Sequence, residues 1–217
     1  MKRPLLIGLI GIGIIFLMVG LRTIVVRGSE REDLKIAITF DDGPHPYYTE
    51  QLLDGLKERN VKATFFVLGE NVEAYPELVQ RMQEEGHLIG NHTYSHLQLT
   101  ECNEDEFIRE LEITNDLIEE ITGEPVGFCR PPYGAWNRKY EKELEMLPVL
   151  WNIDPLDWSC QCCDTIVNRV LCKCHPNGII LLHDGYKTSV TAALEIIDQL
   201  QAKGYRFVTV EEIIMVE

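Results

Sequence analysis

Short apolar runs rich in β-branched and aromatic residues alternate along the chain with longer amphipathic stretches. Such runs are typical of buried strands, and a period near 3.6 residues predicts helices packed on them. The predicted strands are residues 35–40, 61–67, 88–91, 126–129, 148–153, 178–183 and 206–208, and the predicted helices are residues 50–59, 76–85, 105–121, 164–171 and 190–203. Repeated strand-then-helix order predicts an α/β domain with a parallel sheet, either a barrel or an open sheet.

Two residues mark the ends of the longest predicted helix. Asn103 stands three residues before Glu106, which is the spacing of a capping box, and Gly123 follows the last turn. An asparagine at this position accepts a backbone N–H, and glycine readily takes the left-handed conformation that ends many helices. Gly86 and Gly204 are expected to end two other helices in the same way.

The N-terminal segment differs in character from the rest of the chain. An unbroken run of apolar and glycine residues extends over 17 positions, from Leu5 to Leu21, and follows Lys2 and Arg3. This length is at the short end for a membrane span and above that of a usual signal-peptide core. We therefore expect one transmembrane signal-anchor within residues 1–27, with its basic end in the cytoplasm. A cleaved signal peptide is the alternative, and both interpretations place the following domain outside the cell.

Composition and length indicate a short linker and one domain after the N-terminal segment. Residues 28–34 are mostly polar and are expected to form a short linker, and residues 35–217 have a length that suits a single core. The chain has 20 Lys and Arg against 35 Asp and Glu, a formal net charge of −15. Such an excess of negative charge repels phosphate backbones, so nucleic acid is not an expected partner. It does not argue against neutral sugars.

Polar residues gather at the C-terminal ends of the predicted strands, the edge where ligand sites form in parallel α/β folds. The clusters are residues 39–44, 91–96, 130–134, 154–158 and 181–184. His92 and His96 would face the same side if their segment were helical. Together with an aspartate they would form a two-histidine, one-carboxylate set that leaves coordination positions open for water or substrate. Each cluster alone also suits a solvated turn or a structural histidine pair.

In order and separation, these five clusters resemble the five motifs of the polysaccharide deacetylase family, also called the NodB-homology domain or carbohydrate esterase family 4. The resemblance extends from about Lys35 to the C-terminus and includes residues 204–207. It implies that residues 35–217 form an irregular (β/α) barrel of about seven parallel strands. It also implies hydrolysis of N- or O-acetyl groups on sugars.

The resemblance implies a role for each residue on the metal side of the site. Asp42, His92 and His96 would hold a divalent ion, expected to be zinc, although cobalt or another divalent ion also suits these ligands. The ion would polarise the acetyl carbonyl and make a bound water more acidic. Asp41 would be the general base, and Arg130 would hold Asp41 by a charge-assisted hydrogen bond.

On the leaving-group side, His183 would be the general acid and Asp157 would orient its imidazole. The backbone N–H of Tyr133 would complete an oxyanion hole. Trp158 and Leu181 would form the apolar pocket for the acetyl methyl group, although Leu181 also suits plain core packing.

The acids and histidines beside these clusters are expected to be structural. Asp154 is expected to cap its loop, and Asp184 is expected only to bound a turn. His45 and His87 are assigned to turn and strand packing.

Seven cysteines form an odd set for an exported domain, where pairing is the rule. Five of them are close in sequence: Cys160, Cys162, Cys163, Cys172 and Cys174. Disulfides, reduced thiols and a second metal site are all open interpretations. A straight helix over residues 164–171 would separate Cys163 from Cys172 by about 13 Å at ~1.5 Å per residue, against the ~7 Å that a disulfide tolerates between Cα atoms. No bridge between these two is therefore expected.

Tyr133 resembles the residue found in family members that act on N-acetylglucosamine, since those acting on N-acetylmuramic acid often carry arginine there. An exported, membrane-anchored domain then favours peptidoglycan N-acetylglucosamine as the substrate, with chitooligosaccharides or other acetylated glycans as alternatives. A catalytically silent glycan-binding protein should have lost acid, base or metal residues, and all are present. Hydrolysis of a small cyclic amide or ureide is not expected, because such metabolites are cytoplasmic and this domain is expected to be exported.

Overall fold

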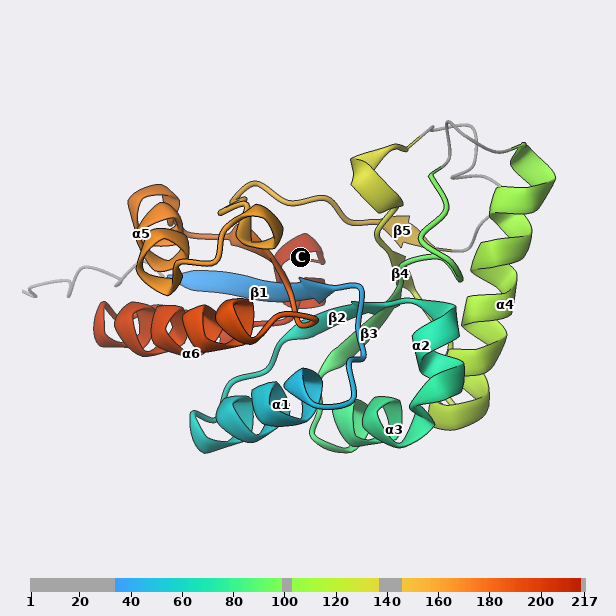
Figure 1. The fold of residues 1–217 in the computed structure, drawn as a ribbon, viewed down its shortest axis with the longest axis horizontal. Helices are drawn as coiled ribbons and strands as arrows, with labels where there is room; N and C mark the ends of the chain where they lie inside the picture. The colour runs from blue at the N-terminus through green and yellow to red at the C-terminus, as the bar shows by residue number, and fades with distance from the viewer. Residues whose placement is uncertain (1–33, 99–102, 137–145, 216–217) are drawn as a thin grey trace, which may run out of the picture. The chain divides into compact units, whose positions relative to one another are not determined.

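The computed structural model describes residues 34–98, 103–136 and 146–215. In this part, helices surround a seven-stranded sheet (Figure 1). The strands are β1 (Lys35–Asp41), β2 (Thr64–Val67), β3 (Leu88–Asn91), β4 (Phe128–Cys129), β5 (Leu147–Pro148), β6 (Gly178–His183) and β7 (Arg206–Val208). The helices are α1 (Tyr48–Glu58), α2 (Gly69–Ala74), α3 (Pro76–Glu84), α4 (Glu104–Thr122), α5 (Cys163–Lys173), α6 (Lys187–Ala202) and α7 (Glu211–Ile214), with short 3-10 turns η1 (Pro132–Gly134) and η3 (Asp157–Ser159).

All strand pairs are parallel, in the order β5-β4-β3-β2-β1-β6. Strand β1 is central: β6 pairs with Ile36 to Asp41 along one edge, while β7 and β2 share the other edge. The register sets Asp41 beside His183. The sheet is thus a curled half-barrel, which confirms the prediction of an α/β fold with about seven parallel strands.

The predicted fifth strand over residues 148–153 is wrong in extent. Strand β5 is only Leu147–Pro148, and further along Ile153 forms an isolated parallel bridge with Ile180 of β6. The backbone N–H of Val149 still bonds to Cys129 of β4, whereas the carbonyl of Ile153 accepts the N–H of Leu181 at 2.9 Å. The segment crosses from one neighbour strand to another, so it cannot form a continuous ladder with either.

The core follows from the alternation of side chains along β1. Ile36, Ile38 and Phe40 belong to the large cluster that includes Leu52 of α1 and Ile196 of α6. Ala37 faces a second, smaller cluster. Every residue of β1 after Lys35 is buried, as expected for a central strand of a parallel sheet covered on both faces.

The helix predictions agree with the structure at the level of whole elements. All five predicted helices are present, and Asn103 caps α4 by accepting the N–H of Glu106 at 2.9 Å, with Gly123 left-handed at its end (φ 71°). Helices α2 and α7 were not predicted, because six and four residues are too few to establish a period.

No helix in the described part of the chain is long and apolar enough to cross a membrane. The predicted anchor within residues 1–27 lies outside the described residues, as does nearly all of the predicted linker.

The six described cysteines are unpaired. Cys163 and Cys172 belong to the same helix, α5, which agrees with the prediction that they do not bridge. Among the described residues, no cysteine belongs to a group of three candidate metal ligands. The seventh cysteine, Cys102, lies outside the described residues.

Candidate active site

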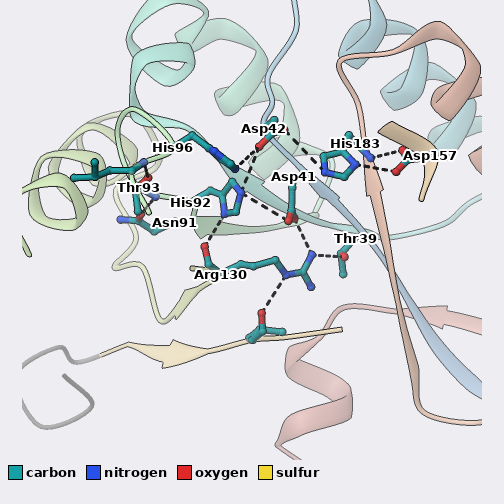
Figure 2. Close-up of polar contacts among 12 residues, drawn as sticks. Thr39, Asp41, Asp42, Asn91, His92, Thr93, His96, Arg130, Asp157 and His183 are labelled. Atoms are coloured by element: carbon teal, nitrogen blue, oxygen red, sulfur yellow. Dashed lines mark hydrogen bonds and ion pairs between the residues drawn. The ribbon is translucent and has the colours of Figure 1, made fainter. Parts of the chain in front are cut away.

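The site begins where β1 ends, at two adjacent carboxylates. Asp41 is the last residue of the strand, and Asp42 takes a left-handed conformation (φ 70°). The carbonyl of Asp42 accepts a hydrogen bond from the side-chain amide of Asn71 at 2.8 Å, which holds this turn. Nε2 of His92 lies 3.8 Å from Oδ2 of Asp41 and 3.3 Å from Oδ1 of Asp42. Both carboxylates therefore reach the same imidazole (Figure 2).

Asp42, His92 and His96 form a group with the geometry of a metal site. Oδ1 of Asp42 lies 3.3 Å from Nε2 of His92 and 3.5 Å from Nε2 of His96, and one ligand atom from each residue lies within 4.8 Å of the others. The same Oδ1 atom is buried without a hydrogen-bond partner. A buried, unsatisfied carboxylate oxygen facing two imidazole nitrogens fits a divalent ion with open coordination positions.

Electrostatics at these candidate ligands favour the protonation states that metal binding would require. Burial opposes ionisation of Asp42, but the neighbouring imidazoles of His92, His183 and His96 lower its pKa. Burial and the nearby His92 also lower the pKa of His96, which favours the neutral ring. Metal ligands must be deprotonated in this way.

The two histidines reach the site from an irregular loop, so the helical segment that would place them on one face is not present. Residues 92–98 form no helix, and Thr93 (φ 69°) and His96 (φ 63°) both take left-handed conformations. These conformations turn the chain back on itself, and the imidazole centroids of His92 and His96 lie 5.0 Å apart. The rings converge although the i, i+4 rule of helices does not apply.

Asp41 is held from below by a buried arginine. Nη1 of Arg130 donates to Oδ1 of Asp41 at 2.7 Å and to the hydroxyl of Thr39 at 2.6 Å. The guanidinium is fully buried and lies over the ring of Phe66, 4.2 Å from its centroid. Asp41 itself is 3% exposed, so its carboxylate has one fixed orientation.

His183 approaches the carboxylates from the side opposite to His92 and His96 (Figure 2). Nδ1 of His183 lies 2.8 Å from Oδ1 of Asp157, whose Oδ2 accepts the backbone N–H of His183 at 2.9 Å. Nε2 lies 4.0 Å from Oδ2 of Asp42. Burial disfavours the charged ring, but the hydrogen bond and charge of Asp157, with the charges of Asp41 and Asp42, raise the pKa of His183 to about 9. Its free nitrogen is thus placed to hold a proton.

A pocket of about 460 Å³ joins these groups. Its lining consists of Asp41, Asp42, His92, His96, Tyr133, Trp151, Asp154, Leu156, Trp158, Leu181, His183 and Tyr186. The exposed ring of Tyr133 packs edge-on against His96, with centroids 4.8 Å apart. Trp158 is exposed at the pocket, whereas Leu181 is buried and lines the pocket from the sheet. All ten predicted site residues come together here, because Arg130 and Asp157 contact the lining directly.

Three pocket residues, Trp151, Leu156 and Tyr186, are not among the predicted site residues. Leu156 lies inside the fourth polar cluster, and Tyr186 lies two residues after the fifth, so proximity to the clusters was the available signal. Trp151 precedes the fourth cluster and had no such signal. Asp154 caps its loop as expected, accepting the N–H of Leu156 at 2.7 Å, and also lines the pocket.

Asp184 does more than bound a turn. Its carboxyl group is fully buried, accepts a hydrogen bond from the hydroxyl of Thr49 and packs against the backbone of Gly43. A Cβ atom on Gly43 would overlap the Asp184 carboxylate. Burial raises the pKa of Asp184 to about 7. Asp184 thus supports the turn that carries Asp42.

Comparison with known proteins agrees with this geometry. The sequence model of the family described as polysaccharide deacetylase matches residues 28–149. The chain is 45% identical over 178 residues to the peptidoglycan-N-acetylmuramic acid deacetylase PdaC of Bacillus subtilis, covering 82% of this chain and 38% of PdaC. The solved structure of PdaC superimposes with a TM-score of 0.81 at 44% identity, covering 84% of this chain and 90% of that one.

Two further relatives extend the range of named substrates. A peptidoglycan-N-acetylglucosamine deacetylase of Bacillus cereus is 45% identical over 182 residues, covering 81% of this chain and 66% of that protein. A chitooligosaccharide deacetylase of Rhizobium leguminosarum bv. trifolii is 40% identical over 191 residues, covering 80% and 89%. This chain spans about two fifths of the length of PdaC and about two thirds of that of the Bacillus cereus protein. Since the family model matches more than half of the residues, the chain belongs to the polysaccharide deacetylase family.

Proposed function

We propose that this protein is a metal-dependent hydrolase that removes N-acetyl groups from a cell-surface polysaccharide, with peptidoglycan N-acetylglucosamine as its substrate. One observation carries the proposal: Asp41, Asp42, His92 and His96 face one pocket from one side, and His183 faces it from the other. An acetamide is a poor electrophile with a poor leaving group. Its hydrolysis needs a base for water, stabilisation of an oxyanion and an acid for nitrogen.

The base side of the site is Asp41. When bound by Asp42, His92 and His96, a divalent ion such as zinc would polarise the acetyl carbonyl and make water more acidic. Asp41 then takes the proton of the attacking water through Oδ2, because Arg130 occupies Oδ1. Having two adjacent carboxylates lets one act as base while the other serves as ligand.

The acid side is His183. A pKa raised to about 9 keeps the imidazole protonated at neutral pH, so Nε2 can give a proton to the departing amine nitrogen. Asp157 binds Nδ1 and stabilises the charged ring. The backbone N–H of Tyr133 is assigned to the oxyanion, and the acetyl methyl group to the apolar wall of Trp158 and Leu181.

The substrate assignment rests on Tyr133 and on the relatives. Two of them are named for peptidoglycan, one for its N-acetylmuramic acid and one for its N-acetylglucosamine, and a third is named for chitooligosaccharides. Tyr133, in place of arginine, favours N-acetylglucosamine. The proposal also places the domain outside the cell, held by a single membrane span within residues 1–27 or released by signal cleavage.

Acetate release from defined acetylated oligosaccharides tests the proposal, with and without a chelator. Peptidoglycan fragments and chitin oligomers are compared, and mass spectrometry locates the deacetylated sugar. Loss of acetyl groups from N-acetylglucosamine of peptidoglycan, abolished by chelator, is expected. Unchanged wall fragments beside deacetylated chitin oligomers would favour a chitooligosaccharide deacetylase, and glycan binding without acetate release would indicate a silent binding protein.

A further inference from the structure

The backbone conformation of the loop that carries His92 and His96 is not determined by local secondary structure. Residues 92–98 form no helix or strand, and two of them, Thr93 and His96, hold left-handed conformations that are unfavourable for such side chains. A backbone of this kind persists only when its surroundings hold it. The partners of its polar groups therefore show what positions these two imidazoles.

The carbonyl groups of this loop are bound from helix α2. The N–H of Gly69 donates to the carbonyl of Thr93 at 3.0 Å, and the N–H of Glu70 donates to that of Tyr94 at 3.1 Å. A Cβ atom on Gly69 would overlap the ring of Tyr94, so the two backbones meet as closely as glycine permits. One side of the loop is thus fixed by main-chain contacts.

The N–H groups on the other side converge on one carboxylate of α4. Oε2 of Glu110 accepts the backbone N–H of Ser95 at 2.8 Å and that of Tyr94 at 3.1 Å. Oε1 of Glu110 accepts the hydroxyl of Ser95 at 2.7 Å. Three donors from two consecutive residues, next in sequence to His96, are satisfied by a single acid. Hydrogen bonds to an ionised acceptor are stronger than those between neutral groups.

Glu110 is itself held firmly. It follows Phe107 by one helical turn and precedes Leu111, and both of these side chains are buried in the main core. The carbonyl of Leu111 accepts the side-chain amide of Asn91 at 2.8 Å, so the same turn of α4 also binds the residue before His92. Oδ1 of Asn91 accepts the N–H of Thr93 at 2.7 Å. Both ends of the ligand segment are therefore tied to one rigid helix.

We propose that Glu110 is a positioning residue that fixes His96 for metal binding by clamping residues 94 and 95. The inference rests on the proposed metal site, and Glu110 is neither one of the three candidate ligands nor a lining residue of the pocket. Losing the clamp leaves the loop free to relax from its left-handed conformations. Metal affinity then falls, because His96 must be reordered when the ion binds.

Zinc binding by the full chain, measured by calorimetry after chelator treatment, tests the inference on Glu110→Gln. Glutamine has the size of glutamate but is uncharged and has one accepting oxygen, so it cannot accept all three bonds, and those it keeps are no longer charge-assisted. Zinc affinity is expected to fall by about 10- to 100-fold, as for other groups that orient metal ligands. Glu112→Gln is the matched control, because it removes the same charge from an exposed position two residues along α4. The control should bind zinc like the wild type.

Two further readouts separate positioning from simple stability. Cobalt-substituted Glu110→Gln should show altered d–d absorption bands, which report ligand geometry and not global folding. Ser95→Ala removes only the 2.7 Å hydroxyl bond and should weaken zinc binding by about two- to tenfold, which provides the test if Glu110→Gln does not fold.

Some results would overturn the inference. A positioning role would be contradicted if Glu110→Gln had the zinc affinity and cobalt spectrum of the wild type. If Glu110→Gln does not fold, an unchanged zinc affinity in Ser95→Ala would contradict it instead. A wild-type chain that binds neither zinc nor cobalt would instead overturn the metal site, and with it both the proposed function and the inference.

Discussion

The carbonyl oxygen of Arg130 lies 2.6 Å from Nδ1 of His92. A carbonyl only accepts hydrogen bonds, so Nδ1 carries the proton and Nε2 presents its lone pair toward Asp42. The guanidinium of the same residue donates to Asp41 at 2.7 Å. One buried residue therefore sets the tautomer of a proposed metal ligand through its main chain and the orientation of the proposed base through its side chain.

Replacing Arg130 by methionine should destabilise the fold strongly, because the Asp41 carboxylate is left buried without its partner. Removing one member of a buried pair typically lowers the free energy of unfolding by about 3–5 kcal/mol. Urea unfolding checks this value. The double variant Asp41→Asn with Arg130→Met should recover part of the loss, since the unpaired charge is gone. Equal destabilisation by Arg130→Met in both backgrounds would contradict the argument.

Asp41→Asn should separate catalysis from metal binding. The amide cannot accept the proton of water, so turnover should fall by about 10²–10⁴-fold. Zinc affinity should be retained, because the three proposed ligands are intact. His92→Ala provides the contrast and should lose zinc binding by calorimetry. A near-normal rate in Asp41→Asn with metal bound would remove Asp41 from the role of base.

Asp157→Asn should weaken the general acid. The substitution removes the hydrogen-bonding anion that raises the pKa of His183, so the pKa should move down toward its ordinary value. NMR titration of His183 in the metal-free chain measures the shift, and turnover should fall by about 10²–10⁴-fold. Asp154→Asn is the control from the same loop, where the side chain bonds to Leu156 and not to His183. An unmoved His183 titration would show that Asp157 does not set its charge.

The position of the site at the strand ends could be predicted, because two patterns of the sequence meet there. Buried runs of β-branched residues stop where polar clusters begin, and parallel strands bring all those ends to one edge. Asp41 and His183, which are 142 positions apart, become register neighbours for this reason. Local chemistry also sufficed for the ends of α4, since Asn103 and Gly123 act within one helical turn.

The conformation of the loop that carries His92 and His96 could not be predicted from its own residues, because it depends on distant parts of the chain. The left-handed Thr93 and His96 belong to a loop that is held by contacts with α2 and with Glu110, which lie elsewhere in the chain. The segment around Ile153 was misread as one strand. Its hydrophobic pattern is that of a strand, although it changes pairing partners along its length.

Gly43→Ala should destabilise the turn that carries Asp42, because the added methyl group overlaps the Asp184 carboxylate. Forcing an extra carbon into a packed site lowers the free energy of unfolding by about 1–3 kcal/mol. Asp184→Ala opens that space, so the effect of Gly43→Ala should shrink in its background. A double-mutant cycle by urea unfolding measures this coupling. Additive effects would show that the two residues do not share the contact.

His87 should make stability depend on pH in a narrow window. Burial, with the charges of Lys62 and Arg81 against the opposing charge of Glu85, lowers the pKa of His87 to about 4 from an ordinary 6.5. The neutral ring accepts the N–H of Ala63 through Nδ1 at 3.1 Å, and protonation of that nitrogen would abolish the bond.

Since the folded-state pKa of His87 lies below the unfolded-state value, the unfolded chain takes up the proton first as the pH falls. The contribution of His87 is fully present above about pH 6.5 and is lost progressively down to about pH 4, by at most about 3 kcal/mol. His87→Asn keeps an acceptor for Ala63 but does not titrate, so groups that titrate in both proteins cancel in the comparison. In the metal-free chain, the free energy of unfolding should therefore fall more in the wild type than in the variant as the pH is lowered across this window. Parallel curves from pH 7.5 to 4.5 would show that His87 is protonated equally in both states, and that burial does not control its charge.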